Sequence, residues 1–116
     1  MKYVMIIAVM MIGMITFAQK IKPEFVQLKD GIITATYFHE NGKVAQTGSF
    51  VNNKRDGEWT SYNNKGTKTA TALFDSGKKV GKWLIRNGDV LTEVDYQNNQ
   101  IASVITKTDK NPVVNN

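Results

Sequence analysis

Apolar and polar residues alternate in short runs from about residue 25 to residue 106, and this alternation predicts strands. The runs are too short for helices and are rich in Thr, Val, Ile and aromatic residues, which suit a pleated, half-buried surface. Turn-forming pairs such as Asn41 with Gly42 and Asn87 with Gly88 separate them. We expect strands over residues 32–39, 44–51, 57–62, 67–74, 80–86, 90–97 and 100–106, with a further one near 25–29. Because the connections are short, these strands should form an all-β antiparallel meander.

The chain also repeats itself, so each pair of strands is expected to be one copy of a hairpin unit. Two copies are defined by four pairs of anchor residues that lie 24 positions apart: Phe50 and Phe74, Lys54 and Lys78, Gly57 and Gly81, Trp59 and Trp83. A weaker third copy follows, in which Tyr96 stands 22 positions after Phe74.

Alternation along the strands predicts how the anchor residues pack. In both copies the glycine and the tryptophan are two positions apart, so they should point to the same face of the sheet. A glycine beside a tryptophan leaves a shallow space that an aromatic ring from a neighbouring strand can fill. We expect that ring to come from Phe50, Phe74 or Tyr96. The opposite face should be solvated, because Thr67, Thr69 and Thr71 form a hydroxyl stripe.

The first residues have the pattern of a helical signal peptide. Lys2 supplies a positive charge, an apolar run extends from Tyr3 to Ala18, and small residues stand at the two positions that signal peptidase reads. The run is short for a membrane span, which needs about 20 apolar residues. We therefore expect cleavage after Ala18 and export to the periplasm or the outside; an uncleaved N-terminal anchor is the alternative.

Composition limits the possible functions further. The sequence contains no cysteine, which excludes disulfides and thiol chemistry. Its 15 basic and 10 acidic residues give a net charge of +5, of which Lys2 would be lost with the signal. The acidic residues are interspersed with the lysines, so nothing resembles the dense basic stripe of a nucleic-acid-binding protein.

Side chains that usually carry catalysis are scarce. His39 is the only histidine, and its position beside a turn favours an exposed or edge-strand role over a catalytic one. The alternate spacing of Asp56 with Glu58, and of Glu93 with Asp95, could place two carboxylates on one strand face, as in a glycosidase or a metal site. A solvated face with nearby lysines is the simpler interpretation. No glycine motif for phosphate binding is present, so we predict no catalytic residue, metal ligand or cofactor.

A basic strip recurs with the repeat, and it is the clearest polar feature of the predicted surface. Its members are Lys54, Arg55, Lys78, Lys79 and Lys82. Lysines at these positions would also keep the hairpin ends soluble and block unwanted strand pairing, which is their simpler role.

Residues 37–96 resemble the variant MORN repeat of small exported bacterial proteins. The pattern is carried by Glu40 to Lys43, Gly48, Phe50, Lys54, Gly57, Trp59 and Tyr62. The second copy departs from it at Asp75 and Ser76, and at Ile85 or Arg86, where an aromatic residue is expected. The resemblance implies an elongated, mostly single-layer sheet of consecutive hairpins that makes protein or membrane-surface contacts, with no catalytic residue in the repeat.

These observations predict a signal peptide at 1–18, an N-terminal approach segment at 19–31, a β-repeat domain at 32–106 and a disordered tail at 107–116. The function expected is a non-catalytic module that binds a protein, or a second copy of itself, in the cell envelope. The alternative is binding of anionic membrane or cell-wall surfaces through the basic strip. The candidate contact surface is a set of recurring aromatic residues: Phe50, Trp59, Tyr62, Phe74, Trp83 and Tyr96.

Overall fold

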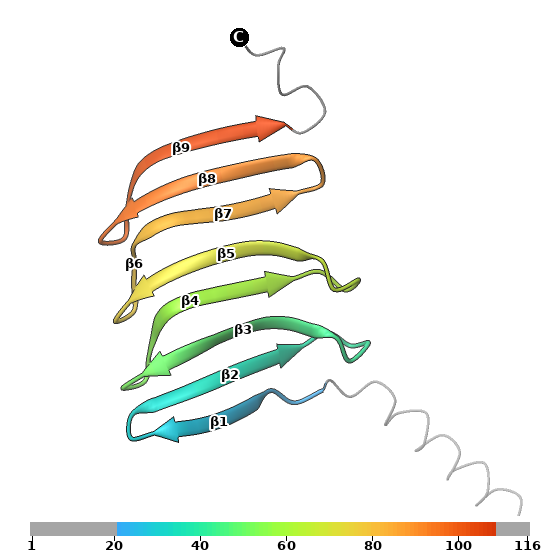
Figure 1. Cartoon of the computed structure of the whole chain (residues 1–116), viewed down its shortest axis with the longest axis vertical. Helices are drawn as coiled ribbons and strands as arrows, with labels where there is room; N and C mark the ends of the chain where they lie inside the picture. The colour runs from blue at the N-terminus through green and yellow to red at the C-terminus, as the bar shows by residue number, and fades with distance from the viewer. Residues whose placement is uncertain (1–20, 109–116) are drawn as a thin grey trace, which may run out of the picture.

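The computed structural model of the chain describes residues 21–108, and they form one open antiparallel sheet (Figure 1). The strands are β1 (Glu24–Lys29), β2 (Ile32–Phe38), β3 (Val44–Val51), β4 (Lys54–Tyr62), β5 (Lys68–Asp75), β6 (Lys78–Lys79), β7 (Gly81–Asn87), β8 (Val90–Gln97) and β9 (Gln100–Thr108). The predicted all-β antiparallel meander is confirmed. The predicted signal peptide lies outside the described residues. β1 occupies part of the segment expected to approach the domain, and β9 extends two residues beyond its predicted end.

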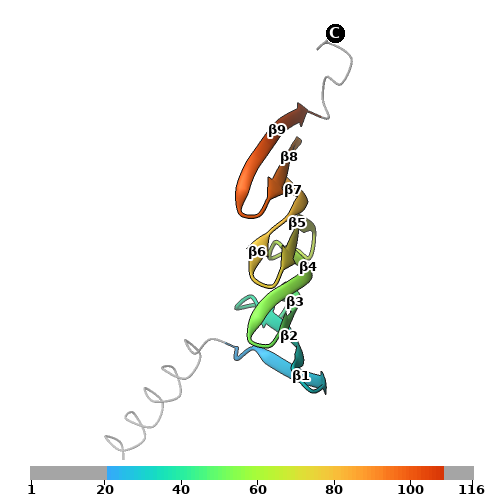
Figure 2. The same cartoon turned by 90° about the vertical axis from the view of Figure 1, so that its left-hand side faces the viewer.

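The strands follow one another across a single layer, with β6 as a short addition to β5 (Figures 1 and 2). β1 and β9 are the two edges of the sheet. Four hairpins close on the same side, where β1 joins β2, β3 joins β4, β5 joins β6, and β8 joins β9 (Figure 1). Three of these turns have two consecutive residues with positive φ, as tight hairpin turns require: Asn52–Asn53, Ser76–Gly77 and Asn98–Asn99.

Successive hairpins are also joined by backbone hydrogen bonds at the turns. Gly77 N donates to Arg55 O at 2.8 Å, and Asn99 N donates to Lys79 O at 2.9 Å. The two acceptors are 24 residues apart and the two donors are 22 apart, so the same bond recurs in consecutive copies. The connection after β7 is shorter than the one after β4, which accounts for the shorter spacing of the third copy.

The second strand of each inner hairpin bends and changes partner. β4 pairs with β3 as far as Asp56, pairs with β5 from Gly57, and rejoins β3 at Thr60. The next hairpin repeats this, because β6 pairs with β5 while β7 pairs with β8 from Gly81. Gly57 and Gly81 have φ values of 74° and 67°, a conformation that glycine adopts at little cost. The repeated glycine is therefore the bend, and the bend opens a gap between neighbouring strands.

A row of aromatic rings crosses one face of the sheet and includes Trp59, one of the buried core residues. We call it the aromatic row: Phe25, Tyr37, Phe50, Trp59, Phe74, Trp83 and Tyr96. Ring centroids of neighbours in contact lie 4.8–6.4 Å apart, in tilted or edge-to-face arrangements. Trp59 and Ala35 are the most buried residues, each 1% exposed.

The opposite face carries a lateral row of threonines. The strand register aligns Thr36, Thr47, Thr60 and Thr71 across β2 to β5. The same line continues through Leu84, Glu93 and Ile105 on β7 to β9. Of the predicted hydroxyl stripe of Thr67, Thr69 and Thr71, only Thr71 belongs to this row, which runs across the strands.

Candidate interaction surfaces

Both tryptophans fill the gaps where neighbouring strands separate. Trp59 Nε1 donates a hydrogen bond to Ser49 O at 3.1 Å, and Trp83 Nε1 donates one to Leu73 O at 3.1 Å. Ser49 and Leu73 are 24 residues apart, so the indole position and its hydrogen bond both belong to the repeat. A buried indole N–H needs such a partner, and here a strand carbonyl supplies it.

The glycine that makes room for Trp59 is not the one that the strand pattern suggested. A Cβ on Gly48 of β3 would overlap the Trp59 indole, whereas a Cβ on Gly57 would meet nothing within 4 Å. Gly57 is needed for its positive φ, and Gly48 for its missing side chain. The pattern placed the space on the same strand as the tryptophan because it contains no information on the gap between β3 and β4.

The predicted contact residues differ in how far a partner can reach them. The ring centroids of Phe50 and Trp59 lie 5.1 Å apart. In the next copy the Trp83 centroid lies 5.2 Å from that of Phe74 and 4.8 Å from that of Tyr96. Trp59 is 1% exposed, so its ring offers no surface, and the other four are half-buried. The remaining residue, Tyr62, lies outside the aromatic row and lines a separate hollow of about 560 Å³.

The predicted basic strip is divided among three environments, of which the first is the aromatic row. The Arg55 guanidinium lies 4.5 Å from the Trp59 ring centre and 5.6 Å from that of Phe74. Lys79 occupies the same place one copy later, with Nζ 5.2 Å from the Trp83 centre and 5.4 Å from that of Tyr96. These cations cover the aromatic row and are attracted by the ring faces.

The other members of the strip behave differently. Lys82 Nζ lies 3.5 Å from a Glu93 carboxylate oxygen. Lys54 and Lys78 are exposed beside the hairpin turns. The five residues therefore do not form one continuous basic surface.

The large exposed apolar residues collect on the two edge strands. Six of the eight such residues in the described chain belong to β1 or β9: Phe25 (57% exposed), Val26 (56%), Leu28 (64%), Ile101 (61%), Val104 (54%) and Ile105 (49%). Sequence reasoning did not single them out. The adjacent apolar pairs Phe25–Val26 and Val104–Ile105 place apolar side chains on both faces of a strand, but inner strands contain such pairs too, as at Ile32–Ile33.

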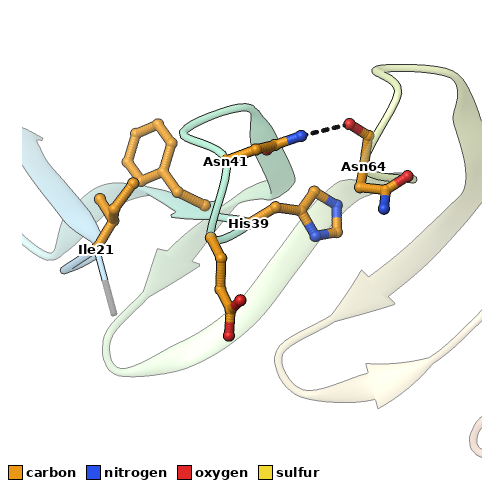
Figure 3. A pocket seen from close by; sticks show the side chains of 6 residues that line it. Ile21, His39, Asn41 and Asn64 are labelled. Atoms are coloured by element: carbon orange, nitrogen blue, oxygen red, sulfur yellow. Dashed lines mark hydrogen bonds between the residues drawn. The ribbon is translucent and has the colours of Figure 1, made fainter. Parts of the chain in front are cut away.

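His39 connects two loops at the side of the sheet opposite the hairpin turns (Figure 3). Its Nε2–H donates to Tyr62 O at 2.8 Å, and Asn41 Nδ2 donates to Asn64 O at 2.6 Å. A hollow of about 570 Å³ beside them is lined by Ile21, Phe38, His39, Glu40, Asn41 and Asn64. The histidine thus fixes the loop after β2 to the end of β4, and Asn41 fixes it to the loop after β4.

Three of the four carboxylates of the two acidic pairs are bound within the fold, and Glu58 is exposed. Asp56 Oδ1 accepts a hydrogen bond from Ser76 N at 2.9 Å. The bend at Gly57 separates Asp56 from Glu58. Asp95 accepts one from Ser103 Oγ at 3.1 Å. Within residues 21–108, no three His, Cys, Asp or Glu side chains are grouped to hold a metal ion. That range also contains no helix long and apolar enough to cross a membrane.

Glu93 is held by two cations on the face of the threonine row. Lys107 Nζ lies 3.0 Å from one carboxylate oxygen and donates a hydrogen bond to it, while Lys82 approaches the other. The hydrogen bond from Lys107, with the positive charges of Lys107 and Lys82, lowers the pKa of Glu93 below its ordinary value. Glu93 therefore stays ionised and joins β7, β8 and β9.

Comparison with known proteins adds no relative: no protein-family model, no curated protein and no solved structure matches the chain. The resemblance to variant MORN repeats stays a prediction from the sequence.

Proposed function

We propose that the chain is a non-catalytic, exported module that binds proteins in the cell envelope by adding strands to the edges of its sheet. The observation that carries this proposal is the concentration of exposed apolar side chains on β1 and β9. An edge strand has a row of unpaired N–H and C=O groups that an extended partner can bind. Apolar side chains on the same strand add contact area to those hydrogen bonds.

The composition of the edge strands supports this function. Proteins that need their edges to stay single protect them with charges, prolines or a covering element. In β1 the charged residues stand only at the two ends, Glu24 and Lys29. In β9 the segment from Gln100 to Thr106 has no charge. The terminal units of repeat proteins usually carry polar outer surfaces, and these two strands do not.

The aromatic row serves the scaffold in this proposal. Trp59 is buried. The Arg55 cation lies over the Trp59 ring, and the Lys79 cation lies over the Trp83 ring. A single-layer sheet has no second layer to pack against, so it needs such a row to hold its hairpins together. The tryptophans would then determine which surfaces are presented without touching the partner.

A capture experiment with matched variants tests the edge. The chain from Gln19 to Asn116 is used as bait in envelope extract, beside Ile105→Lys on edge strand β9 and Ile85→Lys on inner strand β7. Ile85 is 41% exposed, close to the 49% of Ile105, so both variants add one charge at a similarly exposed position. We expect a partner that is lost with Ile105→Lys and kept with Ile85→Lys. Equal capture by both variants would contradict edge binding.

The same experiment separates the anionic-surface alternative. Binding through Lys54 and Lys78 would weaken steeply as salt increases, whereas strand addition with apolar contacts would persist. Vesicles containing anionic lipid, tested without any protein partner, provide the direct comparison. Strong vesicle binding that Lys54→Gln abolishes would favour the alternative.

A further inference from the structure

We propose that the partner of these edges is a second copy of the chain, with β9 of one molecule added antiparallel to β1 of the next. This inference rests on the proposed function, because it requires both edges to bind strands. Each edge would then bind another copy in antiparallel orientation, and the assembly would be an open sheet that grows as copies are added.

The strand count of the sheet makes this addition possible. Consecutive strands across the sheet alternate in direction, and the path from β1 to β9 contains an even number of them, so the two edge strands run in opposite directions (Figure 1). A second copy shifted along the stack therefore presents a β1 that is antiparallel to β9. The aromatic row of both copies then lies on the same side. With an odd number of strands, the same shift would have paired the edges in parallel.

The side chains of the two strands fit one register. On the face of the threonine row, Lys107 falls opposite Glu24 and Ile105 falls opposite Val26. The faces agree, since Glu24 and Val26 pair with threonines of β2 on that face, and Ile105 pairs with Glu93 there. On the aromatic face the same register sets Thr106 opposite Phe25 and Val104 opposite Gln27.

Neighbouring registers lose the attractive pair of Lys107 and Glu24. A shift of one residue would place the aromatic rows of the two copies on opposite faces of the sheet, because side chains alternate along a strand. The row would then not be continuous across the junction. A shift of two residues in one direction would set Lys107 opposite Lys22, a repulsive pair in place of an attractive one. Lys107 would thus lie between Glu93 of its own chain and Glu24 of the next, so charge complementarity selects the register.

The pairing is head-to-tail, and it leaves a free edge at each end of every assembly. Such an interface does not close on itself, so it produces chains of copies rather than a fixed dimer. The junction would resemble the junctions inside the molecule, where the second strand of one hairpin pairs with the first strand of the next. A dimer built from two β9 strands, or from two β1 strands, would stop at two copies.

Analytical ultracentrifugation over a range of concentrations tests this assembly, using the chain from Gln19 to Asn116. We expect species larger than dimers that increase with concentration. Glu24→Lys should weaken association roughly tenfold, because an attractive cross-strand pair becomes repulsive. Lys107→Glu should weaken it similarly, although it also removes the contact with Glu93. Lys78→Glu, at an exposed turn, is the control and should have little effect.

Mixing gives the most specific result. Each charge-reversal variant alone presents like charges at the junction. In an assembly where Glu24→Lys chains alternate with Lys107→Glu chains, residues 24 and 107 have opposite charges at every junction. We expect the mixture to assemble as the parent does. Failure of the mixture to recover would overturn the register, and a dimer unaffected by Glu24→Lys would overturn head-to-tail assembly.

The outcomes also separate this inference from the function on which it rests. A parent chain that stays monomeric, while Ile105→Lys still loses a captured partner and Ile85→Lys keeps it, overturns the second copy as occupant and leaves edge binding standing. A monomeric parent whose two isoleucine variants capture equally overturns both. Because the sequence has no cysteine, cross-linking is a direct check of register. Val104→Cys chains mixed with Gln27→Cys chains should form a disulfide, and with Val26→Cys chains they should not.

Discussion

Trp59 and Trp83 occupy the same position in two copies of one hairpin, yet Trp59 is 1% exposed and Trp83 is only half-buried. Both donate to a strand carbonyl at 3.1 Å, and both have a cation over the ring. The residue at the matching position on the preceding strand differs, because Gly48 stands there in one copy and Ala72 in the other. We expect the Ala72 methyl group to limit how deeply the Trp83 indole can enter its gap.

Truncation of the two tryptophans should show the largest difference between the copies. Trp59→Ala removes a fully buried ring and should lower the free energy of unfolding by roughly 3–5 kcal/mol. Trp83→Ala should cost less, because part of the Trp83 side chain is already exposed to water in the folded state. Urea denaturation followed by circular dichroism measures both. Equal losses would mean that exposure in the folded state does not distinguish the copies.

Gly48→Ala tests the cause of the deeper burial. The added methyl group would overlap the indole, and overpacking of this kind costs roughly 1–3 kcal/mol. The control is the same substitution in a Trp59→Ala background, where the space is empty and the cost should largely disappear. A Gly48→Ala penalty that persists without the indole would point to the backbone of β3 instead.

The cations should contribute less than the rings that they cover. Arg55→Gln should cost roughly 0.5–1 kcal/mol, and Lys79→Gln somewhat less, because Lys79 lies farther from its nearest ring centre. Lys54→Gln makes the same change of charge at an exposed turn residue and is the control. If all three variants lose equal stability, general charge effects would explain the result better than the ring contacts.

Ala72→Gly should make the second copy more like the first. Without the methyl group, the Trp83 indole can move deeper, so its fluorescence emission should shift to shorter wavelength in a Trp59→Phe background that leaves one tryptophan. The net change in stability should be small, because glycine in a strand costs roughly 0.5–1 kcal/mol and deeper burial offsets part of it. An unchanged emission spectrum would show that another contact limits the depth.

The smallest expected difference concerns the opposite face, where Thr71 of one copy corresponds to Glu93 of the next. The pKa of Glu93 is lowered in the folded state, so its ion pairs contribute stability above the unfolded-state pKa. That contribution should be lost as pH falls from the ordinary glutamate range through the lowered folded-state pKa. Urea denaturation at several pH values should therefore give a shallower acid slope for Glu93→Gln. An identical slope in the variant would mean that the lysines do not stabilise the carboxylate.

The strands could be predicted from local pattern because each is bounded by turn residues. β3 and β8 have the predicted limits, and the other predicted strands differ only at their ends. β6 was missed because it is part of a bent strand, and the bend depends on the positive φ of Gly81. Residue spacing does not reveal whether a glycine in a strand pattern is a bend or a space.

The candidate surfaces were predicted less well. The aromatic residues were recognised as a recurring set, but Trp59 proved to be core and Arg55 and Lys79 proved to cover rings. The apolar residues of β1 and β9 were overlooked because an apolar strand gives the same pattern in the middle of a sheet and at its edge. Only strand order reveals which one lacks a neighbour.

The sequence by itself determined the repeat, the alternation and the tight turns, because these depend on residues that are close along the chain. Strand order, the partner change at Gly57 and Gly81, and the depth of each tryptophan were decided by the tertiary structure. The physical reason is that burial depends on atoms from strands distant in sequence. Trp59 is buried because Gly48 on β3 leaves its space empty, and β1 and β9 are exposed because no other strand of residues 21–108 lies beyond them.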